Sequence, residues 1–154
     1  MGCCDMHPDL KAHIEGDLAQ FGFSTLAAKE PEGWIAHTVG LTELGHPEIL
    51  ISGMHGQLCH MVFQKAYHAI KAGQHFKAGE TDDTLGALTC AFKPLSLAAA
   101  EQFCWRVQEF YAGTTKTPTF LQLVLPDKQG NLPWQPGYDT SMTKFQRHLW
   151  VQLH

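Results

Sequence analysis

Charged residues are scarce in this chain of 154 residues, and no stretch concentrates charge of one sign. Asp, Glu, Lys and Arg make up 17% of the sequence, and the formal net charge is −4. Without a basic block the chain lacks the electrostatic footprint of a nucleic-acid-binding protein, so we expect no nucleic-acid partner. Apolar residues reach 44%, enough for residues 1–154 to bury a core as a single domain.

Long hydrophobic runs are also absent, and the first ten residues lack the basic and apolar regions of a secretory signal. The five cysteines include no CxxC pair, so neither a disulfide framework nor the common zinc spacing is indicated. We therefore expect a cytoplasmic protein with reduced thiols and no membrane partner.

The N-terminus leaves three interpretations open. Gly2-Cys3-Cys4 suggests acylation, although Met6 departs from the myristoylation pattern. Cys3 and Cys4 could also bind a soft metal together with His7 and His13. A frayed terminus that leads into a helix is the favoured interpretation.

The common catalytic signatures are missing. There is no GxSxG elbow, no GxxxxGK[ST] phosphate loop and no GxGxxG after a strand. Cys59 and His60 are adjacent, and adjacent side chains on a helix point about 100° apart, so they do not form a nucleophile–base pair. The sequence thus names neither a reaction nor a cofactor.

Apolar stripes at helical spacing predict three helices, at 8–21, 57–72 and 96–111. A glycine follows each stripe within two residues, as is common at the end of a helix. Apolar and β-branched runs predict strands at 23–29, 34–41, 48–54, 85–95 and 119–127. Three strands in succession do not fit strict βαβ alternation. We expect an α+β fold with a mixed, mainly antiparallel sheet of about five strands and three helices packed mostly on one face.

One candidate site follows the second predicted strand, at His46-Pro47-Glu48. In extended backbone, side chains two apart share a face, so His46 and Glu48 could bind a metal or act as an acid–base pair. His37 is a conceivable third ligand, or a buried, hydrogen-bonded core residue. The favoured alternative is structural: His46 caps a turn, Pro47 shapes it, and Glu48 begins a strand.

A second informative stretch is LPDKQGNLPW, residues 125–134. Asp127 can hydrogen-bond its own turn and Gly130 can take positive φ, which predicts a turn followed by a packing tryptophan, Trp134. The functional alternative is the rim of a pocket. We hypothesise that this turn meets the His46 loop and lines one pocket with it. The ligand-binding candidates are Thr38, Gly40, His46, Glu48, Asp127 and Trp134.

An ordered series of motifs carries a family resemblance. The series is Gly33-Trp34, Thr38-Val39-Gly40-Leu41, Gly45-His46-Pro47-Glu48, Gly53, Gly73 with Gly79, Pro126-Asp127, Gly130, and Pro133-Trp134. It resembles the bacterial and actinophage domain-of-unknown-function family numbered 4262, over about residues 20–138. His37 stands where that family usually has an aromatic residue, often tyrosine, which weakens His37 as a metal ligand. The family brings no established activity.

Two functions of different class remain. The favoured one is a binding or accessory protein that holds a small molecule or a protein partner, which fits the missing catalytic signatures. The alternative is a small metal-assisted enzyme that uses His46 and Glu48. Flavin or nucleotide binding on the sheet is weaker, because no phosphate-cradling loop is present. The oligomeric state stays open.

Overall fold

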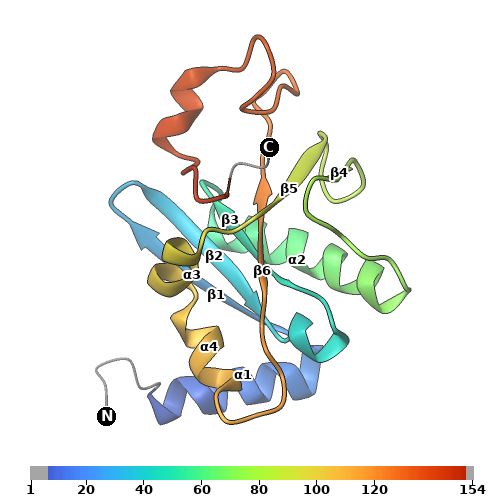
Figure 1. Cartoon of the computed structure of the whole chain (residues 1–154), viewed down its shortest axis with the longest axis vertical. Helices are drawn as coiled ribbons and strands as arrows, with labels where there is room; N and C mark the ends of the chain where they lie inside the picture. Colours follow the sequence, from blue (N-terminus) through green and yellow to red (C-terminus); the bar gives the residue numbers. More distant parts are fainter. Residues whose placement is uncertain (1–6, 152–154) are drawn as a thin grey trace.

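The chain folds around one mixed sheet, shown in Figure 1 by a computed structural model that describes residues 7–151. The helices are α1 (Pro8–Phe21), α2 (Gly56–Lys71), α3 (Leu97–Phe103) and α4 (Trp105–Tyr111), with short 3-10 helices η1 (Leu41–Leu44) and η2 (Thr140–Lys144). The strands are β1 (Ser24–Glu30), β2 (Gly33–Val39), β3 (Glu48–Ser52), β4 (Thr81–Asp82), β5 (Cys90–Pro94) and β6 (Phe120–Val124). The α+β class is therefore confirmed.

The strands lie in the order β1-β2-β3-β6-β5-β4. Neighbouring strands are antiparallel except β3 and β6, which run parallel with Glu48 beside Phe120 and Leu50 beside Gln122. Both parallel strands therefore begin at one end of the sheet. β3 occupies a central position and all five of its residues are buried, because helices cover both faces of the sheet.

Alternate residues of β2 and β3 pack into two separate cores. Ala36 and Ile49 point into the core that α2 covers, whereas Ile35 and Leu50 point into the core that α1, α3 and α4 cover. Within the described residues, three helices thus share one face and the long helix α2 lies alone on the other. This arrangement explains why the third predicted strand is almost entirely apolar.

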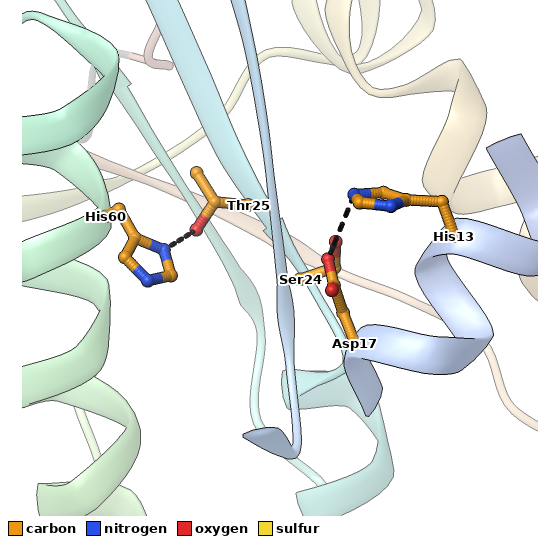
Figure 2. A network of polar contacts seen from close by, with 5 residues as sticks. All are labelled: His13, Asp17, Ser24, Thr25 and His60. Carbon is orange, nitrogen blue, oxygen red and sulfur yellow. Dashed lines mark hydrogen bonds and ion pairs between the residues drawn. The ribbon is translucent and has the colours of Figure 1, made fainter. Parts of the chain in front are cut away.

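Two neighbouring residues of β1 connect this edge strand to both helix layers (Figure 2). The Ser24 hydroxyl donates to the Asp17 carboxylate of α1 at 2.6 Å, and His13 lies 3.3 Å from the same carboxylate. On the opposite face, Thr25 Oγ1 lies 2.7 Å from His60 Nδ1 of α2. These polar contacts join β1 to α1 and α2.

The predicted helix over 96–111 is divided at Cys104. This residue leaves helical geometry, with φ −116° and ψ 19°, and is fully buried. The break separates α3 from α4 while both pack into one core. The predicted strand over 85–95 begins only at Cys90, because Leu85 packs under α2 instead. Periodicity alone missed the two-residue strand β4.

Cys59, Cys90 and Cys104 are free thiols, and burial raises the pKa of each to about 12. The features considered at Gly2, Cys3 and Cys4 lie outside the described residues. None of the helices within 7–151 has the length and hydropathy that crossing a bilayer requires.

Candidate functional site

The two loops expected to share a pocket lie at opposite ends of the sheet, so that hypothesis was wrong. Glu48 pairs with Phe120 at the beginning of β6, whereas Asp127 follows the end of β6 at Val124. The length of β6 alone separates them by about 15 Å. The error arose because both loops adjoin strand ends, and sequence does not tell which ends of two strands coincide.

Glu48 is fully buried and its carboxylate holds together the turn that follows β2. It accepts hydrogen bonds from the hydroxyl of Thr38 at 2.7 Å and from both the N–H and hydroxyl of Thr42, at 2.9 and 2.5 Å. The N–H groups of Gly40 and Leu41 each donate at 3.1 Å. Burial raises the pKa of Glu48, and the bonds from Thr42 and Thr38 oppose this rise. The carboxylate thus satisfies backbone groups that the turn leaves unpaired.

No residue other than glycine fits at position 40 of this turn. Its φ is +123°, and a Cβ there would lie 2.9 Å from the carbonyl oxygen of Gly22. Thr38 and Gly40 therefore act in the same local structure as Glu48.

His46 is also buried, and both of its ring nitrogens contact backbone groups. Nδ1 lies 2.8 Å from the Pro47 carbonyl oxygen, and the Phe76 N–H donates to Nε2 at 3.0 Å. This pattern requires a neutral ring protonated at Nδ1, and burial lowers the pKa of His46 accordingly. A metal would have to displace at least one of these bonds. Residues 7–151 contain no group of three or more His, Cys, Asp or Glu side chains placed to hold a metal ion. Metal binding by His46 and Glu48 alone stays a prediction.

His37 lies in the core and forms a hydrogen bond there, which agrees with its interpretation from the sequence as a buried core residue. It is 4% exposed, and its Nδ1 lies 3.2 Å from the Thr38 carbonyl oxygen. Burial lowers the pKa of His37 to about 4. It is therefore neutral at pH 7.

Asp127 holds the turn in which it lies and the segment that returns toward the sheet. Its carboxylate accepts from the N–H groups of Gln129 and Asn131, both at 2.9 Å, and of Asp139 at 2.8 Å. Burial by itself raises the pKa of Asp127, but these backbone hydrogen bonds outweigh it and lower the pKa. Asp127 thus joins the turn to the C-terminal segment.

A cavity of about 440 Å³ lies between the turn that ends at Trp134 and the segment 138–150, which we call the tail. In Figure 1 the chain extends beyond the end of β6 here and then returns beside β5. Trp134 is the one predicted site residue that lines this cavity. Its walls are Lys93, Pro133, Trp134, Tyr138, Thr140, Thr143, Gln146, His148 and Trp150.

Aromatic rings and one cation dominate the cavity walls. The Lys93 ammonium lies 4.3 Å from the centre of the Trp134 ring. The His148 and Trp150 rings stack with centres 3.8 Å apart and an angle of 26°. The two indoles of Trp134 and Trp150 meet edge to face at 6.0 Å. Such walls suit a flat ring that can stack, with a polar group near Lys93.

Two glutamine amides join the tail to β6 and to Leu125, the residue that follows it. Gln122 donates from Nε2 to the carbonyl of Arg147 at 2.8 Å and accepts from the N–H of Leu149 at 3.1 Å, one bond on each side of His148. Gln146 forms a similar pair with the backbone of Leu125, at 2.6 and 2.9 Å. These side chains replace the backbone ladder of an extra strand and fix the wall that carries His148.

Sequence reasoning missed every wall residue of this cavity contributed by β5 and the tail. The available signal was composition, since the segment after residue 131 is rich in aromatic residues but lacks periodicity. Lys93 carried no signal, because a lysine near the end of a strand is ordinary.

The fold and cavity define an α+β domain with a six-stranded mixed sheet and an open, aromatic-walled cavity that its C-terminal tail lines on one side. The chain belongs to the family described as Domain of unknown function (DUF4262), whose model matches residues 17–139. This match confirms the resemblance. The family region includes Lys93, Trp134 and Tyr138 but ends before the cavity residues of 140–150. No curated protein and no solved structure matches the chain.

Proposed function

We propose that this protein binds a small ring-containing molecule in the cavity between the turn and the tail. The observation that carries the proposal is the pair of indoles, Trp134 and Trp150, that meet in a cavity of about 440 Å³. Ligand pockets commonly occupy 300–1,000 Å³ and combine aromatic walls with a few polar groups.

The state of the tail adds support. Because Gln122 and Gln146 hold the tail to β6 and Leu125, little of this wall would have to become ordered when a ligand enters, and less ordering favours affinity. Trp134 is 44% exposed, so its ring can be reached by a ligand from solvent.

The metal-assisted enzyme that uses His46 and Glu48 receives less support. The polar atoms of both side chains already contact backbone or hydroxyl groups. A catalytic role would need them released from those contacts. We therefore favour a binding protein.

The test uses three naphthalene probes of different charge: 2-naphthoate, 2-naphthamide and 2-naphthylmethylammonium. Calorimetric titration of the full chain should give a Kd below about 1 mM for at least one probe. Trp134→Ala should weaken that binding, while Trp105→Ala, which removes an indole outside the cavity, should leave it unchanged. If none of the probes binds, or if both variants behave alike, the proposal is overturned.

A further inference from the structure

We infer that the ligand is a planar aromatic anion and that Lys93 selects for its negative charge. This inference rests on the proposed function, and it adds a chemical class and a residue responsible for it. Lys93 comes from β5, whereas the aromatic walls come from the turn and tail, so the charge and the rings are held by different parts of the fold.

The first argument is charge. Lys93 is the one Lys or Arg among the residues that line the cavity, and no Asp or Glu lines it. Across the part of the chain that the structure describes, ion pairs occur at His7, His13 and Arg147, and none includes Lys93. A ligand anion would therefore meet an ammonium that has no carboxylate partner.

The second argument is the position of that ammonium. It lies over the face of Trp134, which holds its charge against the ring by a cation–π contact. Lys93 of β5 lies opposite Gln122 of the neighbouring strand β6, and Gln122 holds the tail on both sides of His148. The ammonium and the aromatic wall opposite are thus set relative to each other before a ligand arrives.

The third argument is the remaining polar groups. Thr140 lines the cavity with a hydroxyl, and Tyr138 adds a phenol. Thr143 also lines it, but its hydroxyl already donates to the carbonyl oxygen of Thr140 at 2.7 Å. Burial raises the pKa of Tyr138, so its phenol stays protonated at neutral pH and able to donate. A hydroxyl and a phenol that share a cavity with an ammonium suit the oxygens of a carboxylate, sulfonate or phosphate on the ring.

The experiment compares 2-naphthoate with its neutral isostere 2-naphthamide. We expect wild-type protein to bind 2-naphthoate at least about tenfold more tightly, because a hydrogen bond between two charged groups is stronger than one to a neutral amide. Lys93→Met should remove this preference, so that 2-naphthoate and 2-naphthamide bind with similar affinity, and Lys93→Arg should largely retain it. Raising the salt concentration should weaken 2-naphthoate binding only.

Each outcome separates the inference from the function on which it rests. Equal affinity for the two probes, or a preference that survives Lys93→Met, overturns the inference and leaves ring binding intact. Failure of every probe overturns both. Circular dichroism of Lys93→Met provides the folding control, and measurable binding of 2-naphthamide by this variant shows that the cavity is still present.

Discussion

The hydroxyl of Thr38 joins two strands through Glu48. It donates to the buried Glu48 carboxylate at 2.7 Å and accepts from the N–H of Ile49 at 3.0 Å. With the other donors to Glu48, this contact closes the turn between β2 and β3. Glu48, which the sequence suggested as part of a reactive site, holds this turn together from within.

Replacing Glu48 should therefore cost stability. Glu48→Gln keeps the shape but turns one acceptor into a donor that faces the donors of Gly40 and Thr42. We expect the free energy of unfolding to fall by about 2 kcal/mol or more, since buried groups left unsatisfied cost 1–3 kcal/mol each. Urea denaturation measures the loss. Glu101→Gln, at an exposed helix position, is the control, and equal stability of the two variants would contradict the structural role of Glu48.

His46 should behave as a structural residue as well. His46→Ala leaves the Phe76 N–H without its acceptor and opens a cavity in a buried site. We expect a loss of about 2–3 kcal/mol in stability with no change in 2-naphthoate affinity. The exposed His68→Ala provides the reference. A loss of binding at unchanged stability would instead restore His46 to a ligand site.

His37 should make the protein acid-sensitive. Its pKa is about 4 in the folded chain and about 6.5 when unfolded, so the unfolded state binds more protons between these values and stability falls as pH drops from 6.5 toward 4. This effect should remove about 2 kcal/mol between pH 7 and pH 5. His37→Phe should lose that part of the pH dependence. Parallel curves for wild type and variant would show that His37 does not titrate in this range.

Gly53 links the sheet to the tail, and Gly45 supplies a matched control. Both have positive φ, but a Cβ on Gly53 would lie 2.9 Å from the Phe145 carbonyl oxygen, whereas a Cβ on Gly45 would have no atom within 4 Å apart from its chain neighbours. Gly45→Ala should cost about 1–2 kcal/mol of backbone strain. Gly53→Ala should cost more and should also weaken 2-naphthoate binding by displacing the tail. If the two variants have equal stability and equal affinity, the position of the tail does not depend on its close approach to Gly53.

Much of the fold could be predicted because its signals are local. The bounds of α1 follow from Pro8 and the glycine at position 22, and both ends of α2 fall within one residue of the expected range. The break at Cys104 could not be predicted, since an apolar stripe continues through it. The pairing of β3 with β6 also depends on contacts far apart in sequence.

The candidate site divides in the same way. Trp134 carried a local signal, a tryptophan directly after a proline turn, and it lines the cavity. The rest of the cavity depends on Gln122 and Gln146, whose amides bond to backbone 21–27 residues away. Single polar residues of this kind have no periodic pattern. The sequence showed that Glu48 and His46 are polar residues among apolar ones, so the prediction fell on them. It did not show which backbone groups their side chains bond to.

The indole N–H signals of the four tryptophans test the central claim most directly. Trp134 and Trp150 line the cavity, whereas Trp34 and Trp105 lie elsewhere. When ¹⁵N-labelled protein is titrated with 2-naphthoate, we expect the Trp134 and Trp150 signals to shift along one saturable curve while the other two stay in place. Four unmoved signals, or shifts of Trp34 and Trp105 as large as those of the cavity pair, would contradict a ligand site in the cavity between the turn and the tail.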